Sequence, residues 1–130
     1  MASMIRFAAA SRNAEAMHMT AISPPIDLTG ATSALATWWA WLDIQYWYDG
    51  LNLQISTDGG TTWQIVYSPT PDYFCGAGGE SSWCGSPGAW SPYTADLTPY
   101  VGHVVLLRFS FYSDSYWNYA GAYIDDVRVY

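Results

Sequence analysis

The chain has 130 residues, of which 18% are aromatic and 12% charged, and eleven acidic side chains against four arginines give a net charge of -7. This length predicts one domain, expected over residues 4–130, with Met1-Ala2-Ser3 as a remnant of cloning. The acidic balance argues against nucleic-acid binding, which needs clustered cations. Calcium, sugars and protein partners remain compatible with this charge.

Membrane insertion is not expected. The longest mostly apolar stretch, residues 34–42, is far shorter than the ~20 residues that a spanning helix needs. The chain also opens without the basic, apolar and small-residue pattern of a signal peptide.

The N-terminal region allows two interpretations. Residues 7–19 are rich in alanine, which favours a helix. Residues 5–7 and 17–22 also have the composition of two strands around a turn at residues 11–14. In either case, two consecutive prolines at positions 24 and 25 break the chain before residues 26–28.

Residues 34–48 form a nearly continuous aromatic and apolar run. Such a run predicts a central strand that is covered on both faces. Because aromatic rings dominate the burial energy of small sandwiches, we expect the rings on the predicted strands to lie in the core. They are Trp38, Trp39, Trp41, Tyr46 and Trp63.

A β-hairpin is predicted next. Apolar and polar residues alternate over residues 51–56, and a second strand returns over residues 63–67. Between them, the turn fits the pattern Ser-x-Asp-x-Gly-x-Thr-Trp. We expect Asp58 to accept hydrogen bonds from the turn, Gly60 or its neighbour to take a positive φ, and Trp63 to cover the hairpin.

The turn pattern resembles the Asp box of sialidases and of several secreted binding domains. A sialidase needs several copies around a propeller, and the chain has one. The resemblance therefore implies a structural role for Asp58 and no catalytic one.

Residues 68–100 are predicted to form a long loop, because recurring prolines disfavour a regular central strand there. Cys75 and Cys84 are the only cysteines, and they lie in a Gly- and Ser-rich stretch of this loop. An even count in this context favours a disulfide and a secreted, extracellular protein; two free thiols are the alternative.

Strands are predicted again at residues 101–112 and 122–130, separated by a polar and aromatic loop at residues 113–121. No segment after residue 34 has a convincing helical period. The fold class is therefore all-β.

Several motifs also occur in the order seen in one known family, at residues 22–28, 39–44, 48–50, 56–63, 96–102 and 124–127. The chain resembles the MAM-like jelly-roll domains that accompany secreted bacterial metallopeptidases of the immune inhibitor A type. It is more distantly similar to reelin subrepeats. The resemblance implies a two-sheet antiparallel jelly-roll β-sandwich, and it favours strands over a helix in the N-terminal region.

The resemblance further implies a structural calcium ion at the edge of the sandwich. Asp125 and Asp126 match the strand that carries a calcium ligand in relatives. On a regular strand they point to opposite faces, so one would bind calcium and Asp49 or Asp43 would add a ligand. The alternative is that all four are surface or turn carboxylates.

Aromatic residues are also frequent in the two long loops. Rings held by a disulfide and by prolines form a rigid platform that can stack on sugars or anchor a protein. The alternative is a small core beneath the loop. The candidate ligand-binding residues are Tyr73, Trp83, Trp90, Tyr93, Tyr116 and Trp117.

These observations predict a non-catalytic, secreted accessory or adhesion module that binds a glycan or an extracellular protein. A first alternative is a structural domain that packs against a neighbouring peptidase domain of its parent chain. A remote alternative is a glycoside hydrolase that uses two of the carboxylates as acid and base. Zinc-peptidase, nucleophile-elbow and phosphate-loop motifs are absent from the sequence.

Overall fold

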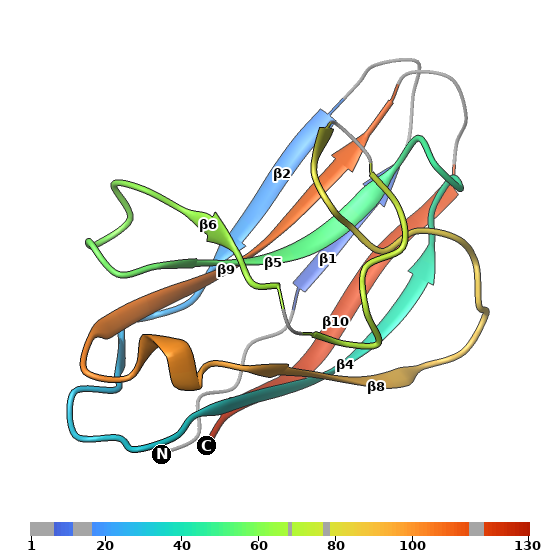
Figure 1. Cartoon of the computed structure of the whole chain (residues 1–130). Coiled ribbons are helices and arrows are strands. Elements are labelled where there is room, and N and C mark those ends of the chain that lie inside the picture. The colour runs from blue at the N-terminus through green and yellow to red at the C-terminus, as the bar shows by residue number, and fades with distance from the viewer. Residues whose placement is uncertain (1–6, 12–16, 68, 77–78, 115–118) are drawn as a thin grey trace.

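The computed structural model of the chain describes residues 7–11, 17–67, 69–76, 79–114 and 119–130. Two antiparallel β-sheets pack face to face (Figure 1). Apart from 3-10 turns such as Thr98–Tyr100, the regular elements in these ranges are strands. The predicted all-β, two-sheet antiparallel sandwich is confirmed.

The first sheet has the strand order β1-β10-β4-β8-β7. In that order the strands are Phe7–Ser11, Tyr119–Val129, Leu35–Asp43, Ser91–Asp96 and Pro69–Thr70. The long strands β10 and β4 form its centre, and their register places Ala122 opposite Leu42. A β-bulge interrupts this pairing between Asp125 and Arg128.

The second sheet has the order β2-β9-β5-β6, and the short strand β3 also pairs with β9. These strands are Met17–Ile22, Val104–Ser113, Gly50–Ser56, Gln64–Ile65 and Ile26–Asp27. The predicted strand at residues 17–22 is confirmed as β2, while β1 runs over Phe7–Ser11 and residues 5–6 of the other predicted strand lie outside the described residues. The described parts of residues 7–19 are strands, so the helical interpretation is wrong for them. They lie in different sheets, and the chain crosses between the sheets repeatedly, as in a jelly roll (Figure 1).

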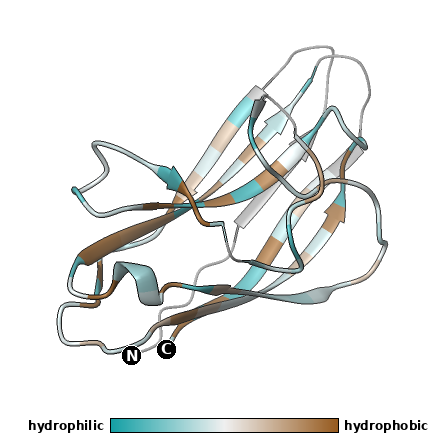
Figure 2. Ribbon diagram, in the orientation of Figure 1, coloured by the Kyte–Doolittle hydropathy of each residue, from teal (hydrophilic) through white to brown (hydrophobic). Residues whose placement is uncertain are grey.

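The core lies between the two sheets. Leu51, Leu53 and Ile55 of β5 are fully buried. Strands β9 and β10 also contribute buried apolar residues, and bands of hydrophobic residues are visible along the strands (Figure 2). Trp38 of β4 lies at the centre, with its ring centroid 5.3 Å from that of Phe109 on the opposite sheet. The predicted core position of Trp38 is therefore confirmed.

The aromatic run at residues 34–48 differs from its prediction. Strand β4 ends at Asp43, and burial alternates along it, so its second face is not covered by another layer. Trp39 is 43% exposed on that face, and Tyr46, beyond the strand, is 50% exposed. Neither belongs to the core, contrary to expectation.

The other two rings of the predicted core set are only partly buried. Trp41 packs edge-on against Tyr123 on the outer face of the first sheet, at 5.6 Å between centroids. Trp63 lies beneath the Arg108 guanidinium, 4.3 Å from its ring centroid. Both positions are stabilised by neighbours on the surface of the sandwich.

Contrary to prediction, the loop expected at residues 68–100 contains a regular strand. Strand β8 lies between β4 and β7, although it includes Pro92. Strand β7 pairs only with Thr94 and Ala95, so Pro92 lies in a part of β8 that has one neighbour. A proline is tolerated at such an edge position because the missing N–H costs no second ladder bond.

The predicted hairpin forms, with Gln54 of β5 opposite Ile65 of β6. In its turn, Asp58 Oδ1 accepts the Thr62 backbone N–H at 2.9 Å and the Ser56 hydroxyl at 2.7 Å. Gly60 has φ +95°, and its carbonyl accepts the Trp63 indole N–H at 3.2 Å. Asp58 therefore holds the turn together.

This arrangement gives Asp58 a role in stability at low pH. Hydrogen bonds from the Thr62 side chain and backbone and from Ser56 lower the pKa of Asp58 to about 2. Because this pKa is below the unfolded value of about 3.9, the stabilisation is complete above that value and is lost as the pH falls through 2. We expect Asp58→Asn to lower Tm near neutral pH and to weaken the fall in Tm between about pH 4 and pH 2. Thermal melts followed by circular dichroism test this; an unchanged acid profile would contradict it.

Candidate functional site

A hollow of about 530 Å³ opens beside the Cys75–Cys84 disulfide. Side chains from the end of β4, the turn that follows it, residues 71–90 between β7 and β8 (the disulfide segment) and β8 line it. Among the described residues, its lining is mostly apolar and aromatic, with two serines and no charged side chain. We term it the aromatic hollow; its principal members are Tyr46, Pro71, Phe74, Gly85, Pro87 and Pro92.

Two exposed rings form one wall of the aromatic hollow. The centroids of Tyr46 and Phe74 are 6.0 Å apart, and Phe74 is about half exposed. Gly85 has φ +95°, and a Cβ added there would lie 3.2 Å from Tyr46 Cδ2. Only glycine therefore fits this backbone while the Tyr46 ring lies against it.

Trp47 extends this aromatic surface in an unusual conformation. Its ring lies edge-on to Tyr46 at 5.1 Å, its side chain is 57% exposed, and its φ is +70°. A bulky residue in the left-handed region costs roughly 1–2 kcal/mol. The fold therefore maintains a strained backbone at a residue whose side chain faces solvent.

Asp49 fixes the turn that carries these rings. Its side chain is fully buried, and Oδ2 accepts the Gln45 backbone N–H at 3.1 Å while Oδ1 accepts that of Asp114 at 3.0 Å. The Asp49 N–H in turn donates to the Gln45 carbonyl at 3.0 Å. Asp49 thus acts as a structural anchor for the presentation of residues 46–48.

The disulfide segment is attached to strand β5. Cys75 and Cys84 are bonded, as predicted, and no free cysteine remains. Backbone hydrogen bonds of 2.9 and 2.8 Å join Leu51 to Trp83 in both directions. This double attachment positions the segment between the aromatic hollow and the second sheet.

Removing the disulfide should cost stability. Its sequence separation of 9 residues closes a short loop, and the chain-entropy relation gives about 2–3 kcal/mol for a loop of this size. We expect the Cys75→Ser/Cys84→Ser double variant to lose this amount of unfolding free energy, as measured in urea. A variant as stable as the oxidised wild type would contradict the expectation.

The structure places the candidate ligand-binding rings Trp83 and Tyr93 in the core. Trp83 is fully buried, and its indole N–H donates to the Pro71 carbonyl at 2.9 Å. Its ring contacts Trp38 and Tyr93, at centroid distances of 5.8 and 5.1 Å. Both rings join the main core, but Tyr93 also lines the aromatic hollow, whereas Trp83 is fully enclosed.

The other candidate ligand-binding rings of the loops differ in how much of each is accessible. The Tyr73 hydroxyl donates to the Leu53 carbonyl and accepts the Leu53 N–H, both at 3.2 Å, and burial raises its pKa. Tyr73 is therefore mainly a support for β5. Trp90 is about half exposed and remains available to a partner. Tyr116 and Trp117 lie outside the described residues.

The four candidate calcium ligands do not converge. Asp43 lies opposite Gly121 and Trp39 lies opposite Asp125, so Asp43 and Asp125 are separated by four residues along the strands. At ~3.3 Å per residue this is about 13 Å, whereas oxygens that share one calcium ion lie within about 5 Å.

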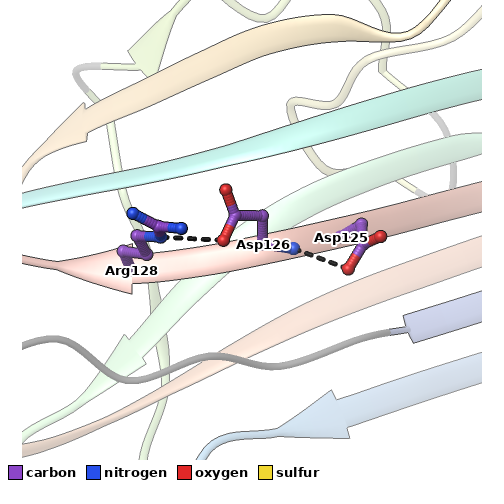
Figure 3. Close-up of polar contacts among 3 residues, drawn as sticks. All are labelled: Asp125, Asp126 and Arg128. Atoms are coloured by element: carbon purple, nitrogen blue, oxygen red, sulfur yellow. Dashed lines mark hydrogen bonds and ion pairs between the residues drawn. The ribbon is translucent and has the colours of Figure 1, made fainter.

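Each of these carboxylates also has a partner within the protein. Asp43 accepts the Ser86 hydroxyl at 2.7 Å. Asp125 accepts the Asp126 backbone N–H at 2.8 Å, and Asp126 pairs with Arg128 at 2.7 Å (Figure 3). Asp126 has φ +57° at the β-bulge, so the regular alternation expected for the two residues does not hold.

Within the described ranges, no three His, Cys, Asp or Glu side chains form a group suited to a metal ion. The expected combination of one carboxylate from Asp125 and Asp126 with Asp49 or Asp43 therefore has no support in this part of the chain. We expect a chelator to leave Tm unchanged in thermal melts of the purified domain. A drop in Tm that added calcium reverses would contradict this expectation.

The sequence pattern did not predict that the rings after β4 lie on a turn and are exposed, because the continuous aromatic run is typical of a single strand. The dipeptide Asp49-Gly50 marks a turn, and it indicates that the strand ends earlier. The membership of Phe74 and the prolines in one hollow depends on contacts between distant segments. No local pattern reports such contacts.

Comparison with known proteins places this architecture in context. The family model described as "Immune inhibitor A-like, MAM domain" matches residues 6–130. The search of curated proteins gives no match. Among solved structures, the chain is similar to the K1 cleaved adhesin domain of Lys-gingipain from Porphyromonas gingivalis W83, with a TM-score of 0.47 and 18% identity. The alignment covers 85% of this chain and 62% of that chain.

Proposed function

This chain belongs to the immune inhibitor A-like MAM domain family, and we propose that it is an extracellular, non-catalytic accessory module that binds a protein partner through the aromatic hollow. The partner segment is apolar and comes from another extracellular protein or from a neighbouring domain of the parent chain. Trp47, whose exposed ring lies edge-on to Tyr46, extends the contact surface beside the hollow.

The backbone of Trp47 is the observation that carries this proposal. Glycine or asparagine would occupy φ +70° at lower cost, and the exposed indole gains little from burial within the domain. The strained backbone of a residue with an exposed side chain has a functional explanation if that side chain contacts a partner. Tryptophan and tyrosine are also the residues that most often dominate binding energy at protein interfaces.

The chemistry of the lining favours a protein over a sugar at this surface. Of the described lining residues, Ser86 and Ser91 are the only ones with polar side chains apart from the two tyrosines, and none carries a carboxylate or an amide. A sugar-binding site needs several convergent hydrogen-bond donors and acceptors, whereas a site for apolar side chains needs a complementary shape and aromatic surface. Aromatic- and proline-lined grooves accept extended apolar segments.

The same lining supports a non-catalytic role. A glycoside hydrolase needs two carboxyl groups that face each other across a cleft at roughly 5–9 Å. No carboxylate is found among the described residues of the hollow's lining, and Asp49 is fully buried and engaged with backbone N–H groups.

A displayed peptide library tests the proposal. Peptides selected on the immobilised wild-type domain should bear apolar and aromatic residues, and Phe74→Ser should reduce their binding by about tenfold or more. Phe74 is exposed, so the substitution should leave Tm nearly unchanged. Binding is measured by interferometry on each selected clone.

Tyr67→Ser is the matched control, because Tyr67 is an exposed ring that does not line the hollow. It should bind the selected peptides as the wild type does. The proposal is contradicted if selection yields no binder, or if both variants retain full binding.

A further inference from the structure

A second cavity, of about 220 Å³, lies over the outer face of the second sheet. Strands β2, β9 and β5 form its floor, and the disulfide segment forms one wall. It is separate from the aromatic hollow, since the two share no lining residue. We term it the polar cavity; its side chains are His18, Asn52, Glu80, Ser82, Ser110 and Tyr112.

The register of three strands brings these residues together. Tyr112 of β9 lies opposite both His18 and Gly50, and Ser110 lies opposite Asn52 in the next row on the same face. Gly50 contributes no side chain, so one position of the floor is open backbone. His18 Nε2 and Ser110 Oγ share a hydrogen bond of 2.6 Å across the floor.

The wall of the polar cavity is held in a fixed position. Asn52 Nδ2 donates to the Ser81 carbonyl at 2.9 Å, and Gln54 Nε2 donates to Glu80 Oε2 at 2.9 Å. Arg108 Nε in turn donates to Gln54 Oε1 at 2.7 Å. These bonds orient the Glu80 carboxylate before any ligand arrives, and a preorganised site loses less entropy on binding.

Buried polar side chains on the outside of a sheet are unusual. Asn52 and Ser110 are both at least nine-tenths buried, yet they lie on the face opposite the core. Within the described ranges, the second carboxylate oxygen of Glu80 makes no hydrogen bond to protein. The cavity therefore combines enclosed donors and acceptors with an acceptor that is left for a ligand.

We propose that the polar cavity binds one neutral sugar residue of a glycan. A volume below the roughly 300–1,000 Å³ of drug-sized sites suits a single small ligand. Hydroxyl, amide, imidazole and carboxylate groups match the mixed donors and acceptors of a pyranose, and the Tyr112 ring offers a face for its C–H groups. Among the described residues, no lysine or arginine lines the cavity, so the proposal is for a neutral ligand.

An NMR titration of the ¹⁵N-labelled domain tests this inference. The neutral probes are D-glucose, D-galactose, D-mannose and N-acetylglucosamine; inorganic phosphate and choline serve as charged probes. At least one sugar should shift the amide signals of Asn52 and Ser110, with half-saturation on the order of 1 mM for so small a ligand. Phosphate and choline should leave both signals in place.

Two substitutions assign the binding to the cavity. Glu80→Gln should weaken the sugar by about tenfold, because it removes a charged acceptor. Ser110→Ala should weaken sugar binding by about fivefold. Ser110 lies on the floor of the cavity, so this substitution leaves the contacts that attach the disulfide segment in place. Phe74→Ser, at the aromatic hollow, should bind the sugar as the wild type does, which separates this inference from the proposed protein-binding function.

The inference is overturned if no neutral sugar moves these signals. It is equally overturned if phosphate or choline moves them and the sugars do not. Wild-type sugar binding in both Glu80→Gln and Ser110→Ala, with Tm showing that each variant is folded, would also reject it.

Discussion

Replacing Trp83 with alanine should lower the free energy of unfolding by about 3–5 kcal/mol, which is the range for large aromatic residues in cores. The ring is fully buried and contacts Trp38, Tyr73 and Tyr93. Its removal leaves a cavity at the point where the disulfide segment joins the core. Urea unfolding followed by fluorescence and circular dichroism measures the loss.

Trp90→Ala is the matched control, because Trp90 belongs to the same segment and is about half exposed. We expect a change within about 0.5 kcal/mol, as for most surface substitutions. Equal stability losses in the two variants would contradict the assignment of Trp83 to the core.

The second large effect is expected at Asp49. Asp49→Asn keeps the size of the side chain but replaces one acceptor oxygen with an NH₂ group, which then faces a backbone N–H. The lost charged hydrogen bond and the donor left without an acceptor together cost about 2–4 kcal/mol. The result should appear as a lower midpoint in urea with an unchanged slope.

Asp43→Asn is the comparison variant, because Asp43 is less buried and its bonding to Ser86 can be retained by an amide oxygen. We expect it to cost less than about 1 kcal/mol. If the two variants lose equal stability, Asp49 is not the anchor of the turn.

Asp49→Asn should also weaken binding at the aromatic hollow. Its two backbone contacts, to Gln45 and Asp114, hold the turn that presents Tyr46, Trp47 and Tyr48. The effect on a partner is indirect, so Asp49 is a positioning residue for this surface. A structural residue elsewhere, such as Asp58 in the β5–β6 turn, should leave peptide binding unchanged.

The fold was predictable where the signals are local or ordered along the chain. The hairpin around Asp58 follows from a turn whose residues contact one another within eight positions. The disulfide follows from two cysteines in one flexible segment. The sandwich itself was implied by the order of the family motifs, since composition alone left the N-terminal region open between helix and strand.

The errors arise where tertiary contacts override local composition. The aromatic run at residues 34–48 has the pattern of a doubly covered strand, but only one face of β4 meets the other sheet. Pro92 argued against a strand, yet β7 ends before reaching it. In both cases the outcome depends on which neighbours a strand has, and those come from distant parts of the chain.

The candidate site was predictable only in outline. Sequence indicated the disulfide segment and its rings, but it could not separate the buried Trp83 from the exposed Phe74, because both lie in the same kind of local context. The spatial relation of the candidate calcium ligands could not be predicted for a related reason. The separation of Asp43 from Asp125 is set by strand register, and the orientation of Asp126 by a β-bulge.

Paired measurements on Trp47→Gly test the central claim most directly, because glycine suits φ +70° and removes the ring. Glycine removes the backbone strain at this position, which stabilises the folded domain. The lost contact with Tyr46 and the greater freedom of glycine in the unfolded chain act in the opposite direction, so the unfolding free energy should change by less than about 1 kcal/mol. Peptides selected on the wild type should nevertheless bind the variant at least about tenfold more weakly. Unchanged peptide binding to a folded Trp47→Gly domain would contradict the proposal that this aromatic surface binds the partner.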